Sequence, residues 1–82
     1  MMTLTETEVT RTIDARGMAC PGPLLALIGA IRQGQTGDTI AVLSSDAGSK
    51  SDIPAWCAKA KHEIVEVVEV SGHARFVVRK TH

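Results

Sequence analysis

The sequence predicts an α+β fold, a two-layer sandwich in which two helices cover one face of a four-stranded mixed sheet. Three observations lead to this prediction. The chain has 82 residues, of which 44% are apolar, so it can bury one modest core and forms a single domain. Strand and helix patterns alternate in the order β-α-β-α-β-β. Each helical segment has one apolar stripe, which must pack against the sheet.

The first strand is expected from Val9 to Ala15, and the first helix from Pro21 to Gln33. Apolar residues alternate along the strand, although Arg11 falls on its apolar face. Proline suits a first helical turn because the N–H that it lacks would have no partner there. The apolar stripe of the helix consists of Leu24, Leu27, Ile28 and Ile31. Gly34 and Gly37 are expected to end the helix and turn the chain.

The second strand, Asp38 to Ser44, is apolar on both faces, which predicts a central place in the sheet. The second helix follows a short loop and ends near His62. Ser49 and Asp52 are both candidate N-caps, and Pro54 favours an irregular turn before a regular part that begins near Asp52. The residues expected to share its buried face are Ile53, Trp56, Cys57 and Ala60.

Two further strands, Glu63 to Val70 and His73 to Lys80, are separated only by Ser71 and Gly72, which predicts a tight hairpin. The expected cross-strand pairs, all facing the core, are Val67 with Phe76 and Val65 with Val78. The side chains expected to form ion pairs on the other face are Glu66, Arg75 and Arg79.

Charge and hydropathy disfavour several functions. Nine basic and nine acidic residues balance, whereas a nucleic-acid binder usually has a basic surplus. The longest apolar run, residues 24–31, is too short to cross a bilayer. Residues 1–8 are polar and acidic, without the pattern of a signal peptide. We therefore expect residues 1–8 to form a flexible leader, residues 9–82 to form the domain, and the protein to be cytoplasmic.

The chain has two cysteines, Cys20 and Cys57, which are expected to be reduced in that compartment. Their spacing to the three histidines does not fit a zinc site, so we predict neither a metal nor a cofactor. Cys57 shares a helix face with Ile53 and Trp56. Its expected role is therefore inert packing.

Cys20 directly precedes Pro21, and this places it at or beside the N-cap of the first helix. The unpaired N–H groups and the positive dipole end of the helix favour a thiolate, so the thiol pKa should lie below its usual value of about 8.5. Pro21 and Pro23 donate no N–H. We expect the N–H groups of Gly22 and Leu24 to be the donors that face Cys20.

No second cysteine lies near Cys20. In the Cys-X-X-Cys motif of thiol–disulfide oxidoreductases, a resolving cysteine lies three residues after the first cysteine. The third residue after Cys20 is Pro23. A sulfur atom on Cys20 must therefore wait for a thiolate from another molecule, as a carrier requires.

The segment Asp14-Ala15-Arg16-Gly17-Met18-Ala19-Cys20-Pro21-Gly22-Pro23-Leu24-Leu25 resembles the signature of the TusA/SirA-like sulfur carriers, with Ile13 where leucine is usual. A second matching block comprises residues 45–49, 52–57 and 62–63. The motif residues that would support Cys20 are Arg16, Gly17, Pro21, Gly22, Pro23 and Leu24.

The resemblance implies the same sandwich fold and a carrier that holds a sulfane sulfur as a persulfide on Cys20. It further implies a stoichiometric relay rather than independent turnover. The implied donors are a cysteine desulfurase or a rhodanese, and the implied acceptors are DsrE-type or other sulfur carriers. The pathway stays open among tRNA thiolation, cofactor synthesis and sulfur oxidation.

One departure from the family concerns the first helix, where relatives often carry lysines and residues 24–31 have no charge. This leaves Arg16 and the helix terminus to stabilise a thiolate. Leu25, Ala26, Gly29 and Ala30 lie off the apolar stripe. They indicate tighter internal packing, a docking surface for a partner or a homodimer contact.

Two other functions remain as alternatives. Cys20 could serve a redox or regulatory binding module, in which its oxidation changes partner binding. Nucleic-acid-binding domains also share this topology, and fold does not fix function. The neutral charge disfavours that last alternative.

Overall fold

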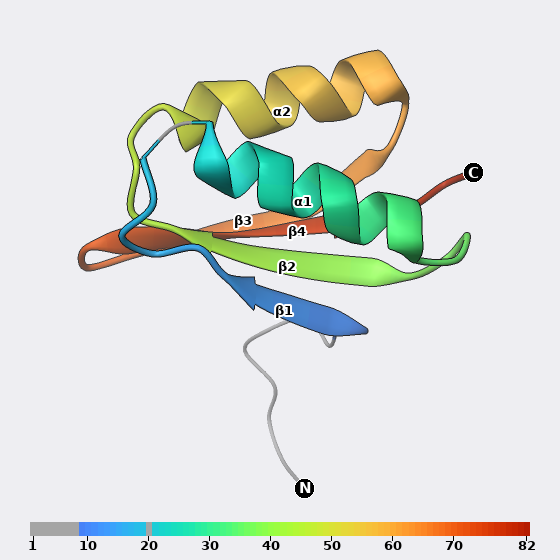
Figure 1. Cartoon of the computed structure of the whole chain (residues 1–82), viewed down its shortest axis with the longest axis horizontal. Coiled ribbons are helices and arrows are strands. Elements are labelled where there is room, and N and C mark those ends of the chain that lie inside the picture. The colour runs from blue at the N-terminus through green and yellow to red at the C-terminus, as the bar shows by residue number, and fades with distance from the viewer. Residues whose placement is uncertain (1–8, 20) are drawn as a thin grey trace, which may run out of the picture.

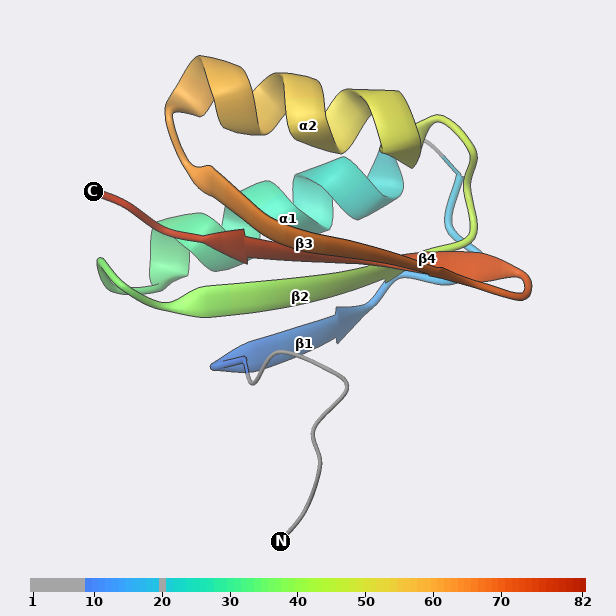
Figure 2. The same cartoon turned by 180° about the vertical axis from the view of Figure 1, so that it is seen from behind.

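The computed structural model describes residues 9–19 and 21–82, and it confirms the predicted sandwich. The elements are β1 (Arg11–Asp14), α1 (Gly22–Gln33), β2 (Thr39–Ser44), α2 (Ser49–Ala60), β3 (Glu63–Val70) and β4 (His73–Arg79). Both helices pack on one face of the sheet, and both begin at the end where the β3–β4 hairpin turns (Figure 1, Figure 2). Among the described residues, no helix is long and apolar enough to span a membrane.

The sheet has the strand order β1-β2-β4-β3. β1 and β2 are parallel and joined through α1, whereas the β2–β4 and β3–β4 pairs are antiparallel, so the sheet is mixed as predicted. β2 lies between β1 and β4, and most of its side chains are buried. This confirms the central position that its two apolar faces predicted.

The core lies between the sheet and the two helices. Its buried residues are Ala15, Leu27, Ala30, Ile31, Ile40, Val42, Ile53, Cys57, Ala74, Phe76 and Val78. From the predicted stripe of α1, Leu27 and Ile31 are buried, while Leu24 and Ile28 are only half-buried. Ala30 was expected off the stripe and is instead buried, because it continues a second row with Pro23 and Leu27 at i, i+4, i+7 spacing.

α1 begins one residue later than predicted. Pro21 is the N-cap and Gly22 the first helical residue. The end of the helix is confirmed, since Gly34 is the C-cap and donates its N–H to the carbonyl of Ile31 at 3.1 Å. Gly37, with φ of 97°, then turns the chain toward β2 in a conformation that favours glycine.

β1 is shorter at both ends than the predicted strand. Ile13 packs against the core, and Ala15 is fully buried just beyond the strand, where its N–H donates to the carbonyl of Leu43 at 2.9 Å. Arg11 is exposed at the start of the strand. Its guanidinium donates a hydrogen bond of 3.4 Å to the side-chain oxygen of Gln33 at the end of α1. Its position on the apolar face is therefore compatible with the fold.

The start of α2 differs from the prediction. The N-cap is Gly48, without a side-chain cap, rather than Ser49 or Asp52. The Ser49 hydroxyl is buried and forms a hydrogen bond of 2.7 Å with the hydroxyl of Ser44, so it is not available to cap the helix. Asp52 lies in the first turn, beside the positive end of the helix dipole.

The predicted irregular turn before Pro54 is present but belongs to the helix. The N–H of Lys50 donates to Ala47, and that of Ser51 to Gly48, each three residues back. These are the tighter bonds of a 3₁₀ turn, which commonly begins a helix. α2 therefore begins three residues before Asp52 and contains Pro54 in its interior.

The hairpin register is partly as predicted. The structure confirms the pair Val67–Phe76 but not Val65–Val78, because Ile64 lies opposite Val78 and Val65 is an extra residue in a bulge. Phe76 and Val78 are fully buried, whereas Val65 and Val67 are 38% and 45% exposed. Val67 thus lies on the same face of the sheet as Phe76, as predicted, but neither Val65 nor Val67 on the edge strand β3 is buried.

Ion pairs cross the face of the sheet that the helices leave uncovered. Arg75 pairs with Glu66 at 3.3 Å, as predicted, and both side chains are partly buried. Arg79 pairs with Glu63. These contacts support the register of the hairpin.

Candidate functional site

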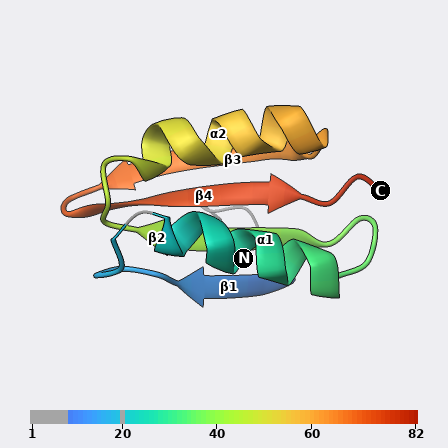
Figure 3. The ribbon, with the colours of Figure 1, turned by 45° about the horizontal axis from the view of Figure 1, so that its top comes forward.

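Apart from Cys20, the predicted site residues belong to the segment that joins the end of β1 to α1 and to the first turn of α1. β1 ends, and both helices begin, at the same end of the sheet (Figure 3). Cys20 itself lies outside the described residues. The site is therefore built from the chain on either side of it, residues 14–19 and 21–25.

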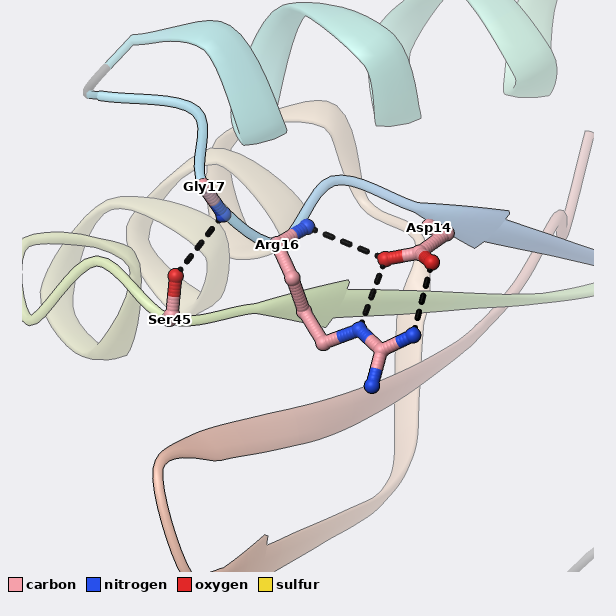
Figure 4. Close-up of polar contacts among 4 residues, drawn as sticks. All are labelled: Asp14, Arg16, Gly17 and Ser45. Carbon is pink, nitrogen blue, oxygen red and sulfur yellow. Dashed lines mark hydrogen bonds and ion pairs between the residues drawn. The ribbon is translucent and has the colours of Figure 1, made fainter.

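Asp14 and Arg16 form a bidentate ion pair at the start of the loop between β1 and α1 (Figure 4). The Nε and one terminal nitrogen of Arg16 donate to the two carboxylate oxygens at 2.8 and 2.7 Å, and its backbone N–H donates to the carboxylate at 3.2 Å. The side-chain hydrogen bond, followed by the backbone one, lowers the pKa of Asp14 to about 2.

This pairing bears on the expectation that Arg16 stabilises a thiolate. Its guanidinium is engaged by a carboxylate two residues away. What the structure shows for Arg16 is a contact that fixes the first turn of the loop. A contribution to the thiolate stays a prediction.

Gly17 takes a left-handed conformation with φ of 87° and donates its N–H to the hydroxyl of Ser45 at 2.9 Å (Figure 4). Ser45 directly follows β2. The bond joins the loop that leads to Cys20 with the loop that leads to α2. Ser45 was not among the predicted site residues, and the signal that could have found it is its place at the start of the second matching block.

The rest of the loop is held by its backbone and by packing. The N–H of Met18 donates to the carbonyl of Ala15 at 3.1 Å and closes a turn. A Cβ atom at Gly22 would lie 3.1 Å from the Cβ of Met18. Glycine at this position therefore lets the loop pack closely against the start of α1.

The donors at the start of α1 differ from the expectation. The N–H of Gly22 donates to the carbonyl of Ala19 at 2.8 Å, so it is not the unpaired donor that the sequence predicted for Cys20. Pro21, at the N-cap, is exposed. Pro23 is buried in the first turn, where the missing N–H of proline is tolerated. Pro23 thus also fixes α1 to the core.

Leu24, the last predicted supporting residue, contacts the core from one side and a groove from the other. The groove lies between α1 and α2 and encloses about 260 Å³. Its lining residues are Leu24, Asp52, Ala55, Trp56 and Lys59. The groove therefore reaches the start of α1 through Leu24 alone among its lining residues.

Cys57 is 1% exposed in the core, and this burial raises the pKa of its thiol to about 11. A thiol with this pKa is protonated at neutral pH and a poor nucleophile. The predicted packing role is confirmed.

Within residues 9–19 and 21–82, no group of three or more His, Cys, Asp or Glu side chains is arranged to hold a metal ion.

The fold and the site together define a class, a small α+β sandwich whose anchored β1–α1 loop leads through Cys-Pro-Gly-Pro into the first helix. Comparison with known proteins makes this specific. The family profile of "Sulfurtransferase TusA" matches residues 11–80. The chain belongs to the TusA family of sulfur carriers, whose members relay sulfur between proteins.

Two individual proteins illustrate the relationship. A protein of Archaeoglobus fulgidus, named "Putative sulfur carrier protein", is 48% identical over 68 residues, which cover 83% of this chain and 93% of the relative. The crystal structure of a SirA-like protein from Desulfitobacterium hafniense superposes with a TM-score of 0.78, at 21% identity, over 89% of this chain and all of that one. The second likeness concerns the fold alone.

Proposed function

We propose that this chain accepts a sulfane sulfur on Cys20 and passes it, as a persulfide, to an acceptor protein. The observation that best supports this is the anchoring of the preceding loop. Asp14 holds Arg16, and Ser45 holds Gly17, three residues before Cys20. A nucleophile that must meet reactive sulfur atoms on other proteins benefits from such a rigid support.

Loading would be a transfer of neutral sulfur. The thiolate of Cys20 attacks the terminal sulfur of a persulfide on the donor. A new S–S bond forms on Cys20, the S–S bond of the donor breaks, and the donor thiolate leaves with the electron pair. Release to the acceptor repeats the step with the acceptor thiolate as nucleophile, so no external oxidant or reductant is needed.

The electrostatics of α1 support this chemistry. The helix has 12 residues and begins at Gly22, directly after Cys20-Pro21. The positive end of its dipole favours an anion at this end, whether thiolate or persulfide. Cys57 cannot compete for sulfur, because its thiol is buried and protonated at neutral pH.

The partners and the pathway are proposed from the family. Donors of the cysteine desulfurase or rhodanese type and acceptors such as DsrE-type carriers fit a stoichiometric relay. The sulfur would serve tRNA thiolation, cofactor synthesis or sulfur oxidation. The cytoplasm, as the compartment of this relay, stays a prediction from the sequence.

Mass spectrometry of the protein after exposure to a donor tests the proposal. A rhodanese with thiosulfate, or a desulfurase with L-cysteine, should add one sulfur atom to Cys20. The adduct should be absent in Cys20→Ser and retained in Cys57→Ala. Absence of the adduct with both donors and with inorganic polysulfide would contradict the proposal. Oxidation of Cys20 by peroxide without any sulfur transfer would favour the redox-regulatory alternative.

A further inference from the structure

Two buried serines join the end of β2 to the start of α2. Ser44 is the last residue of the strand and Ser49 the first residue of the helix. Within residues 9–19 and 21–82 they are the only buried polar residues, at 2% and 3% exposure. Their hydroxyl oxygens lie 2.7 Å apart and share a hydrogen bond. The pair therefore closes the loop of residues 45–48 at its base.

Ser44 occupies a position where packing alone would favour an apolar residue. Ile40 and Val42 precede it on the same face of β2, and both belong to the core. Its partner across the sheet is Ala74, which is also a core residue. A buried hydroxyl is unfavourable unless it is hydrogen-bonded. The hydroxyl of Ser44 is therefore better explained by its hydrogen bonds than by core packing.

The serine pair also shapes the loop that it closes. The Ser44 hydroxyl accepts the N–H of Asp46 at 3.1 Å. The carboxylate of Asp46 accepts the N–H of Gly48 at 3.1 Å, and its carbonyl accepts the N–H of Ser49 at the same distance. The hydrogen bonds thus run from one end of the loop to the other, and Ser45 lies within this bonded turn.

Ser45 carries the effect of the loop to the segment before Cys20. Its side chain is exposed, and its hydroxyl accepts the N–H of Gly17 at 2.9 Å (Figure 4). An exposed side chain has few packing contacts to hold it, so the position of this acceptor depends on the backbone of the loop. Gly17 lies three residues before Cys20.

We propose that Ser44 and Ser49 are positioning residues for Cys20. Their hydrogen bond holds the loop of Ser45, and the bond from Gly17 to Ser45 transmits this order to the segment that leads to the cysteine. The inference rests on the proposed function, in which Cys20 is the nucleophile. A purely structural role is the competing explanation, because α2 has no side-chain cap and the pair fastens its start. Only a positioning role predicts a change in the reactivity of Cys20.

Alanine variants of the pair test the proposal by alkylation of Cys20 with iodoacetamide. In Ser49→Ala the rate at pH 7 should fall about threefold, and the pH profile should move to higher pH. The double variant Ser44→Ala/Ser49→Ala should behave alike, and it leaves no single buried hydroxyl without its partner. Loading by inorganic polysulfide should slow to a similar extent, since both reactions use the thiolate. The matched control, Ser51→Ala, removes an exposed serine from α2 and should react like the parent chain.

A second alanine separates positioning from stability. In a Ser45→Ala background the connection to Gly17 is absent, so Ser49→Ala should not slow alkylation further. It should still lower the urea midpoint, because the serine pair is broken in either background. Parent-like alkylation in both Ser49→Ala and the double variant would overturn the proposal. The same slowing with and without the Ser45 hydroxyl would also overturn it, since the effect would then not pass through Ser45.

The two readouts keep this proposal apart from the proposed function. Alkylation of Cys20 requires no transfer of sulfur. Failure of polysulfide to load the parent chain would therefore contradict the proposed function, whereas the alkylation rates decide whether the serine pair positions Cys20.

Discussion

The backbone N–H of Gly17 donates a hydrogen bond of 2.9 Å to the hydroxyl of Ser45, 28 residues further along the chain. Ser45 follows β2 and precedes α2, which lines the groove, while Gly17 precedes the cysteine and α1. One contact thus connects the segment that leads to Cys20 with the loop that leads to the other helix. We expect it to matter for reactivity more than its energy alone would suggest.

Replacing Ser45 tests this contact. Ser45→Ala should cost about 1 kcal/mol of unfolding free energy, the usual value of one hydrogen bond. It should also loosen the support of Cys20, so that the pKa of this thiol rises toward the ordinary value of about 8.5. The rate of alkylation by iodoacetamide as a function of pH measures that pKa.

Two variants control for nonspecific effects at this position. Ser45→Thr retains the hydroxyl and should restore the parent profile. Ser51→Ala removes an exposed serine from α2 and should leave the profile unchanged. A parent-like pH profile in Ser45→Ala, together with the expected loss of stability, would show that the contact is only structural.

The ion pair between Asp14 and Arg16 has an acid-dependent signature. The pKa of Asp14 is lowered to about 2 in the folded chain, so the folded state binds its proton more weakly than the unfolded state does. The stabilisation is complete above the ordinary aspartate pKa of about 4 and is lost as the pH falls toward 2. Arg16→Gln should raise the Asp14 pKa toward its ordinary value, as measured by NMR titration of the carboxyl carbon.

The matched control is Arg79→Gln, which removes another exposed arginine, one that pairs with Glu63. It should leave the titration of Asp14 unchanged. A parent-like Asp14 pKa in Arg16→Gln would show that other groups hold the carboxylate in its ionised form.

Much of the fold could be predicted from the sequence because its signals are local and agree with one another. The two-sided apolar pattern of β2 predicted its central place, and the Ser71-Gly72 turn predicted the hairpin. The errors arose where tertiary contacts decide between local options. Ser49 is a good N-cap by propensity, but its hydroxyl pairs with that of Ser44 in the core. Val65 fits the alternation of β3, but a bulge removes it from the register.

The candidate site was predictable as a motif but not as a set of contacts. The sequence contains Asp14, Arg16 and Ser45 but does not reveal which groups they bind. The hydrogen bonds of Arg16 and Gly17 depend on how the loop turns after β1. The groove depends on how α1 packs against α2, and no local sequence pattern predicts the distance between the two helices.

Two glycines should respond to alanine in opposite directions. A Cβ atom at either Gly17 or Gly29 would meet no atom within 4 Å, so sterics with neighbours do not decide the outcome. Gly17 has φ of 87°, where alanine costs about 1–2 kcal/mol. Gly29 lies within α1, where alanine should gain about 1 kcal/mol. Urea unfolding of Gly17→Ala and Gly29→Ala should therefore give shifts of opposite sign, and shifts of the same sign would contradict the left-handed turn.

The two cysteines should differ in reactivity. Because Cys57 is buried and its thiol pKa is raised to about 11, native protein should release one equivalent of thionitrobenzoate from Ellman's reagent, and unfolded protein two. Cys57→Ser places a hydroxyl in the core and should lower the unfolding free energy by about 1–3 kcal/mol. Two fast equivalents from native protein would contradict this burial.

His62 should make stability depend on pH in a range well above that of Asp14. Its ring lies 5.6 Å from that of Trp56 and is stacked on that of His82 at 4.5 Å. Its Nδ1 accepts the backbone N–H of Thr81 at 3.2 Å, so this nitrogen must be unprotonated for the bond to form. Burial, together with the positive charges of His82 and Lys80, lowers the pKa of His62.

A lowered histidine pKa means that the unfolded chain binds the proton more readily than the folded chain. The folded state is therefore most favoured above the ordinary histidine pKa of about 6.5, and it loses stability as the pH falls below that value. The urea midpoint should decrease between about pH 7.5 and pH 5.5. His62→Gln should flatten this dependence, whereas His73→Gln, a histidine outside the stack, should preserve it. An equally steep decrease in His62→Gln would assign the effect to another group.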